Sequence, residues 1–281
     1  MLRKSFALAA LGLAFLSGSA MAATTKEEPK DIHWSFEGPL GKFDQAQLQR
    51  GYKVYREVCS ACHPMELLHF RNLGDKGGPF YDPKYPNPNN NPRVKAIAKD
   101  YQFDDIDSET GDVVKRPGTA ADTFPKPFPN EPAARASNGG ALPPDLSDMA
   151  KAREGGPAYI YSILTGYKTP PKAMTVPAGK YYNPYMPGDM SAFWSGDPAN
   201  TPEGGFIAMP PPLADGKVTF DDGTKSTVDN EARDVSAFLT WASEPKMEER
   251  KSFGLAAMIY LVIFSVLLWF SYKRIWRNVA H

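Results

Sequence analysis

The chain has 281 residues, a formal net charge of zero at pH 7 and only 2 cysteines. Two cysteines are too few for a disulfide framework, and a balanced charge argues against a nucleic-acid partner. A hydrophobic content of 42% excludes a disordered polar chain. The 27 prolines all lie within 29–245, so long helices and central strands should be scarce there.

Residues 1–22 have the pattern of a secretory signal peptide. Arg3 and Lys4 form a positive start, residues 6–16 are apolar but too short to span a bilayer, and Ala-Met-Ala at 20–22 is a cleavage site. The alternative is an N-terminal membrane anchor. Cleavage after residue 22 would export the mature chain, which in a bacterial cell means to the periplasm.

Residues 253–272 form a run of 20 residues without a charge. A bilayer core of about 30 Å needs about 20 helical residues, so this run predicts a transmembrane helix rather than the alternative, a buried core helix. With an exported N-terminus, one span would leave 273–281 in the cytoplasm. We therefore expect a single-pass protein of the bacterial inner membrane with a periplasmic domain over 23–252.

The exported part is predicted to begin and end with an amphipathic helix. The first is expected to run from Asp44, an N-cap with Gln47 completing a capping box, to Cys59. The second is expected over 228–242 with Thr227 as cap. We expect a mainly α fold with long proline-rich loops.

The crossing point and the segments between these helices also follow from the pattern. Gly51 inside the first helix predicts a close approach of another backbone, so Gly51 and Tyr55 should cross Phe238 and Trp241. Shorter helices are expected at 144–154 and 157–166, loops at 79–92 and 117–132, and no helix within 167–225.

Cys59-Ser60-Ala61-Cys62-His63 is a C-x-x-C-H motif and uses both cysteines of the chain. Two thiols one turn apart can add to the two vinyl groups of one porphyrin, and the adjoining histidine can then bind the iron. A redox dithiol, a zinc site and a structural disulfide are the alternatives. The dithiol motif normally opens a helix whereas this motif closes one, and zinc would need two further ligands. The motif therefore predicts one covalent haem c held by Cys59 and Cys62, with His63 as an iron ligand.

A methionine on the opposite face of the iron is common in c-type cytochromes and raises the reduction potential. Met65 is too close to His63 to reach that face. The remaining candidates in the exported part are Met149, Met174, Met186, Met190, Met209 and Met247. Met209 is favoured because three prolines follow it and stiffen its loop, whereas the others have packing as the simpler role.

Several stretches together resemble the cytochrome c1 family of the alphaproteobacterial and mitochondrial type, the haem c subunit of the cytochrome bc1 complex. These stretches are FDQAQLQRGYKVYREVCSACHPM (43–65), FPKPFPNEPAARASNGGALPPDLSDMAKAREGG (124–156), YIYSILTGY (159–167), YYNPYMPG (181–188), MPPPL (209–213) and DVSAFLTWASEPKMEERKSFG (234–254). They span nearly the whole mature chain. C-x-x-C-H alone would indicate only a c-type cytochrome.

The resemblance implies a site. It makes Met209 the second iron ligand, opposite His63, and it places four residues of the N-G-x-A-L-P-P-D-L segment in the haem pocket: Asn138, Ala141, Pro143 and Pro144. Arg153 matches a residue that binds a haem propionate; an exposed helix charge is the alternative. Tyr159 and Leu164 match further pocket positions. Some family members carry an extra disulfide in this domain, for which the chain has no cysteines to spare.

The resemblance also implies a function and partners. The chain would be a subunit of a quinol–cytochrome-c reductase, without a substrate-binding catalytic site of its own. Electrons would come from the Rieske iron–sulfur protein, after quinol oxidation at cytochrome b, and leave to a soluble or membrane-bound cytochrome c. The complex is expected to be dimeric.

Five acidic residues fall within ten positions and suggest a way to recognise the acceptor. They are Asp104, Asp105, Asp107, Glu109 and Asp112. We hypothesise that they steer a basic cytochrome c; a solvated loop is the alternative.

Overall fold

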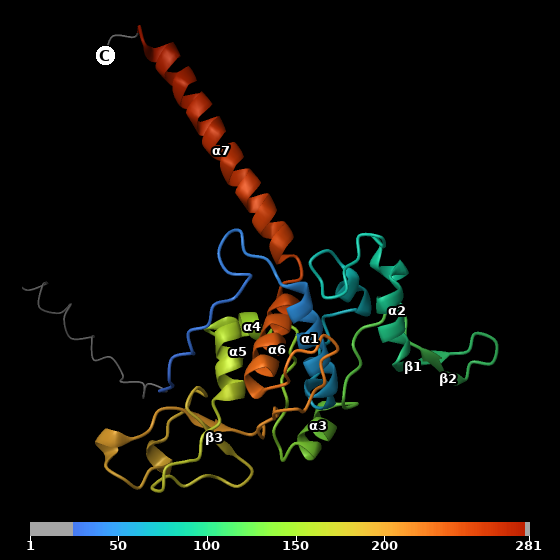
Figure 1. The fold of residues 1–281 in the computed structure, drawn as a ribbon, viewed down its shortest axis with the longest axis vertical. Coiled ribbons are helices and arrows are strands. Elements are labelled where there is room, and N and C mark those ends of the chain that lie inside the picture. Colours follow the sequence, from blue (N-terminus) through green and yellow to red (C-terminus); the bar gives the residue numbers. More distant parts are fainter. Residues whose placement is uncertain (1–24, 279–281) are drawn as a thin grey trace, which may run out of the picture.

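The computed structural model describes residues 25–278, so the predicted signal peptide lies outside the described range. The described part is mainly helical, as predicted, with short strands (Figure 1). Its α-helices are α1 (Gln45–Glu57), α2 (Pro92–Lys99), α3 (Glu131–Ser137), α4 (Met149–Ala152), α5 (Gly156–Thr165), α6 (Val228–Ser243) and α7 (Met247–Trp276). Its strands are β1 (Gln102–Ile106), β2 (Val113–Pro117), β3 (Tyr181–Asn183) and β4 (Gly205–Ile207). Short 3₁₀ turns are η1 (Cys59–Ala61), η2 (Phe70–Gly74), η3 (Pro88–Asn90), η4 (Ser191–Phe193) and η5 (Pro198–Asn200).

Helix α1 begins as its sequence predicts. The carboxylate of Asp44 accepts hydrogen bonds from the backbone amides of Ala46 and Gln47, which satisfies two of the amides that a helix start leaves unpaired. The Gln47 side chain interacts with Asp234 on α6. Gln47 thus joins the two helices, where the sequence had predicted the second half of a capping box.

Helices α1 and α6 cross at the predicted place. A Cβ added at Gly51 would lie 2.0 Å from the carbonyl oxygen of Asp234 and 2.6 Å from Cβ of Phe238. The rings of Tyr55 and Phe238 have centroids 5.8 Å apart, and Trp241 stacks on Phe238 at 5.5 Å. All of these side chains are buried, so the crossing is the centre of the core.

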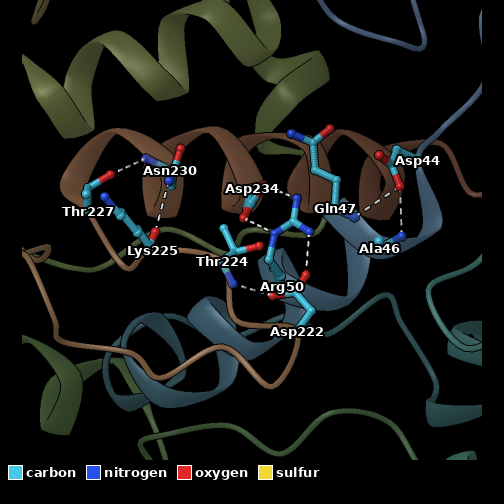
Figure 2. A network of polar contacts seen from close by, with 10 residues as sticks. All are labelled: Asp44, Ala46, Gln47, Arg50, Asp222, Thr224, Lys225, Thr227, Asn230 and Asp234. Carbon is cyan, nitrogen blue, oxygen red and sulfur yellow. Dashed lines mark hydrogen bonds and ion pairs between the residues drawn. The ribbon is translucent and has the colours of Figure 1, made fainter.

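Arg50 adds a polar tie to this crossing (Figure 2). Its guanidinium donates to both carboxylate oxygens of Asp234 on α6, at 2.7 and 3.2 Å, and to Asp222 in the preceding loop at 2.8 Å. Asp234 is almost fully buried. The two parallel bonds fix the relative position of α1 and α6 in a way that one bond could not.

Three segments between the long helices differ from the sequence prediction. Helix α2 begins where a loop was expected to end, with Asn91 as N-cap and Pro92 at its first position. The segment with the five acidic residues at 104–112 forms the antiparallel hairpin β1–β2, which projects from the helical body (Figure 1). Of the helix expected at 144–154, only 149–152 is helical, as α4. The residues before it bond instead to the chain after the C-x-x-C-H motif.

The segment 167–225 has no α-helix, as predicted. It contains η4, η5 and the short antiparallel pair β3–β4, which forms a lobe on the side of α5 away from α7 (Figure 1). Met174, Tyr182 and Met190 are buried together there. Met209 follows two residues after the end of β4.

Helix α7 continues almost directly from α6 and extends far beyond the domain (Figure 1). It is long and apolar enough to cross a membrane, and the most apolar stretch of it is exposed rather than packed against the domain. A 30-residue helix is about 45 Å long, enough to cross a hydrocarbon core and both interfaces. The alternative of a buried core helix is therefore wrong.

Candidate haem-binding site

The C-x-x-C-H motif forms a tight turn directly after α1. The backbone amides of Cys62 and His63 both donate to the carbonyl of Cys59, at 3.1 and 2.9 Å. This turn, η1, brings both thiols and the imidazole to the end of one helix. Both cysteines are free and half-buried. Burial raises the pKa of Cys59 to about 12, so its thiol is neutral at physiological pH.

The imidazole of His63 is oriented by the predicted pocket segment. Its Nδ1 lies 2.8 Å from the carbonyl oxygen of Pro144. Because a carbonyl can only accept, Nδ1 carries the proton and Nε2 keeps its lone pair. Burial lowers the pKa of His63, with the Pro144 carbonyl and Asp145 acting in the opposite direction. The neutral ring is the form that binds a metal.

The segment 144–147 lies alongside the chain that follows His63. The amide of Leu146 donates to the carbonyl of Pro64 at 2.9 Å, and the amide of Glu66 donates to the Asp145 carboxylate at 2.8 Å. The Ser147 hydroxyl accepts from the amide of Leu67. The predicted pocket segment and the chain after the C-x-x-C-H motif, about 80 residues apart, are therefore held together by one backbone bond and by the Asp145 and Ser147 side chains.

The other end of this segment is a turn after α3. Asn138 ends α3 and donates from its side chain to the carbonyl of Ala134 at 2.7 Å. The amide of Ala141 then donates to the carbonyl of Asn138 at 3.1 Å. Gly139 and Gly140 have φ of +59° and +87°, a region that favours glycine. Asn138, Ala141 and Pro143 are half-buried and lead the chain toward His63.

Met209 lies in a separate apolar cluster with other residues of the predicted pocket. It packs with Met186 and Ile207 against buried Tyr159, Ile163 and Tyr185. The Tyr167 hydroxyl donates to the Met209 carbonyl at 3.0 Å. Leu164, which follows Ile163 on α5, packs instead against the main core. Helix α5 therefore supports the methionine loop from one side.

The methionine loop also passes close to the C-x-x-C-H motif. Lys217 donates from Nζ to the carbonyl of Pro212 at 2.7 Å, and the same ammonium interacts with the Cys59 thiol, lowering its pKa against the larger effect of burial. Lys217 therefore bonds to the loop that starts at Met209 and also acts electrostatically on Cys59.

Most competing methionines have packing roles in the structure. Met65 and Met247 are buried in the main core, and Met174 and Met190 in the β3–β4 lobe. Met149 packs at the edge of the main core. Only Met186 shares the cluster of Met209, where the Tyr159 hydroxyl contacts its sulfur at 3.9 Å.

Arg153 is exposed at the C-terminal end of α4. It donates to the carbonyl of Ala152 at 3.1 Å and interacts with the Tyr159 hydroxyl, lowering its pKa against the larger effect of burial. The guanidinium therefore lies at the edge of the Met209 cluster. Its assignment to a haem propionate stays a prediction.

Sequence reasoning gave no role to two residues that the structure places at the site. Tyr167 donates to the Met209 carbonyl. Asp145 accepts from the Glu66 amide, and its charge raises the pKa of His63 against the larger effect of burial. Both lie within the motif stretches T-G-Y and P-P-D-L. Their partners are 42 and 79 residues away, so no local pattern would identify them.

These residues fit a haem. Two thiols are one turn apart, a neutral imidazole has a fixed tautomer and a lone pair, and the thioether of Met209 lies on a proline-rich loop. A helical domain with this set of donors, carried on one membrane-length helix, has the construction of a membrane-anchored c-type cytochrome.

Comparison with known proteins identifies the family. The sequence model of the family described as "Cytochrome C1 family" matches residues 34–279. "Cytochrome c1" of Rhodospirillum rubrum is 40% identical over 98% of this chain and 97% of its own length. "Cytochrome b/c1" of Bradyrhizobium diazoefficiens is 42% identical over 98% of this chain, which spans only 39% of that longer protein. "Cytochrome c1, heme protein, mitochondrial" of Kluyveromyces lactis is 42% identical over 88% of this chain and 75% of its own length.

The chain belongs to the cytochrome c1 family, and with it comes a haem cofactor, electron transport and membership of a membrane-bound cytochrome bc1 complex.

Proposed function

We propose that this chain is the electron-transfer subunit of a cytochrome bc1 complex, with one haem c attached through Cys59 and Cys62 and ligated by His63 and Met209. The hydrogen bond from His63 Nδ1 to Pro144 carries the proposal, because it leaves Nε2 as the free imidazole donor of the C-x-x-C-H turn. Met209, on the loop bonded by Lys217, is proposed as the donor for the opposite face of the iron.

The chemistry supplied by the haem is one-electron transfer. The protein's own residues orient the ring, support the thioether and exclude water. Two protein ligands would leave the iron no open position, which favours transfer without bond chemistry. The relatives' names support a place beside cytochrome b. We further propose the Rieske protein as electron donor, a cytochrome c as acceptor and a dimeric complex.

The proposed topology is an exported domain over 23–252, a membrane span over 253–272 and a cytoplasmic tail over 273–281. Glu248 and Glu249 lie in the first turn of α7 and Lys273 and Arg274 in the last. Lys246, Arg250 and Lys251 flank the other end, so these charges alone do not set the orientation. The predicted signal peptide, which would export the N-terminus, supports a cytoplasmic C-terminus.

The ligand assignment is tested by Met209→Leu, with Met186→Leu as the matched control from the same cluster. Redox titration of the purified complex should show a potential lower by more than about 100 mV for Met209→Leu, since axial ligands span roughly 0.8 V. That variant should also bind carbon monoxide. Met186→Leu should retain the native potential. If Met209→Leu left the potential and spectrum unchanged, Met209 would not be the ligand.

A further inference from the structure

Residues 36–43 form a closed loop between the N-terminal segment and α1. The amide of Lys42 donates to the carbonyl of Ser35 at 3.1 Å and joins the two ends of the loop. Gly38 has φ of +69°, and a Cβ added at Gly41 would lie 1.9 Å from the carbonyl oxygen of Glu37. The loop is therefore tight and has one defined shape.

This loop is fastened to the first turns of α7. Lys251 donates from Nζ to the carbonyl of Phe36 at 2.6 Å and to that of Gly41 at 3.4 Å. The Glu248 carboxylate accepts from the amide of Phe43 at 2.9 Å. Figure 1 shows the loop, in blue just before α1, rising beside the base of α7. Its tip is thus held at a fixed height along the membrane helix.

The aromatic residues of the loop face the core, but its leucine does not. Trp34 and Phe36 are buried, and the rings of Phe36 and Phe43 have centroids 4.9 Å apart. Leu40, at the tip, is 74% exposed. The fold therefore presents one large apolar side chain on the side from which α7 leaves the domain.

The tip lies at the level where a bilayer would begin. Lys251 is two residues before Phe253, the start of the uncharged run, which is about 3 Å along the helix. The polar interface of one leaflet is about 5–7 Å thick. Basic side chains, which can meet headgroups, lie nearby. Lys42 follows the tip, Lys246 precedes α7 and pairs with Glu249, and Arg250 on α7 pairs with Glu244.

We propose that Leu40 inserts into the lipid interface of the membrane that α7 crosses. The 36–43 loop is then a second membrane contact, which fixes the tilt of the haem domain relative to α7. Lipid is the partner rather than protein, because one leucine between Pro39 and Gly41 offers far less than the roughly 800 Å² that a stable protein interface needs on each side. This inference rests on the proposed membrane span of α7.

The test places the photoreactive amino acid p-benzoylphenylalanine at position 40 of the full chain, in membranes that contain the assembled complex. After irradiation, mass spectrometry identifies what is attached. The matched control carries the same group at Ile106, which is 68% exposed on the hairpin that projects away from α7 (Figure 1). Burial of a leucine-sized group corresponds to roughly tenfold or more preference for lipid, so phospholipid adducts at position 40 should exceed those at 106 by about that factor.

A cross-link from position 40 to another polypeptide, no lipid adduct, or equal lipid adducts at both positions would each overturn the proposal. The span of α7 is checked separately by carbonate extraction. A chain that is released from the membrane contradicts the span itself. A chain that is retained, but without the adduct at 40, contradicts only the role of Leu40.

Discussion

A single hydroxyl holds the backbone of the proposed methionine ligand. Tyr167 donates to the Met209 carbonyl at 3.0 Å, and burial raises the pKa of this phenol well above its usual value, so it remains a donor at all physiological pH. The thioether itself is carried by a loop of three prolines. Tyr167 is therefore a positioning residue for the proposed iron ligand.

Replacing Tyr167 with Phe should weaken methionine ligation without removing the methionine. One hydrogen bond is worth about 1 kcal/mol, which corresponds to roughly a fivefold shift between bound and detached methionine. On heating, the long-wavelength absorption band of methionine-ligated ferric haem should disappear at a lower temperature than in the native protein.

Tyr182→Phe is the matched control for this loss. Its hydroxyl donates to the Glu203 carbonyl at 2.7 Å, in the same lobe but away from Met209. The control should lose a similar amount of stability and keep the native band. Equal loss of the band in both variants would show that Tyr167 acts only through general stability.

The crossing of α1 and α6 depends on the absence of a side chain at Gly51. Alanine normally stabilises a helix by about 1 kcal/mol over glycine. In Gly51→Ala the new methyl would meet the Asp234 carbonyl, which is backbone and cannot rotate away. Overpacking typically costs about 1–3 kcal/mol, so we expect a net loss of stability and a lower Tm by circular dichroism.

Gly254→Ala on α7 is the control, because a Cβ there meets nothing within 4 Å. It should leave the Tm unchanged or raise it slightly. A Gly51→Ala variant as stable as the native chain would mean that the two helices can separate at no cost.

The Arg50–Asp234 pair makes a second test at the same joint. Removing one partner of a buried pair leaves a buried charge and costs about 3–5 kcal/mol. Arg50→Met and Asp234→Leu should each lower the Tm strongly, whereas the double variant should be more stable than the sum of the two losses predicts. Asp222→Asn should matter little, because that carboxylate is much more exposed. Additive single losses would contradict the coupling.

Local sequence patterns predicted the helices that have a capping residue and apolar residues at helical spacing. Helix α1 has Asp44 as cap and α6 has Thr227, and both have apolar residues at helical spacing. Helix α2 also has such a signal, Asn91 as cap with Pro92 in the first turn, but the prolines before it hid the pattern. The hairpin escaped prediction because acidic residues are depleted in strands.

The candidate site also has a part that local sequence predicts and a part that only the folded chain shows. The C-x-x-C-H motif stands out in the sequence because the proposed attachment chemistry fixes the spacing of Cys59, Cys62 and His63. The bonds from His63 to Pro144 and from Tyr167 to Met209 join distant segments that meet only in the folded chain. Such pairings depend on the tertiary fold, and residue spacing carries no trace of them.

Charge is unevenly distributed over the whole molecule. Residues 23–252 carry 27 Lys and Arg against 32 Asp and Glu, and the last acidic residue of the chain is Glu249. The proposed exported domain is therefore acidic and the proposed cytoplasmic tail basic. This net charge favours a cationic partner for the domain at low salt.

The β1–β2 hairpin concentrates this charge on a projecting element. Asp104 pairs with Lys115 and Asp105 with Arg116, across the two strands. Asp107, Glu109 and Asp112 lie at the turn. The backbone amides of Glu109 and Thr110 donate to Asp107 and lower its pKa, so this carboxylate is charged at physiological pH. Ion pairing thus neutralises the base of the hairpin and leaves its tip acidic.

The acidic tip gives the docking hypothesis a sharper test. In the purified complex, the variant Asp107→Asn/Glu109→Gln/Asp112→Asn should reduce a basic cytochrome c more slowly at low salt, by about tenfold, since electrostatic steering accounts for 10- to 1,000-fold in association. The rate should fall less steeply with ionic strength than in the native complex. Neutralising all five acidic residues should add little, because Asp104 and Asp105 already have partners. The control, Glu154→Gln/Asp221→Asn, removes two exposed carboxylates elsewhere and should keep most of the native salt dependence. An unchanged salt dependence in the five-residue variant would show that the hairpin carries charge without guiding the acceptor.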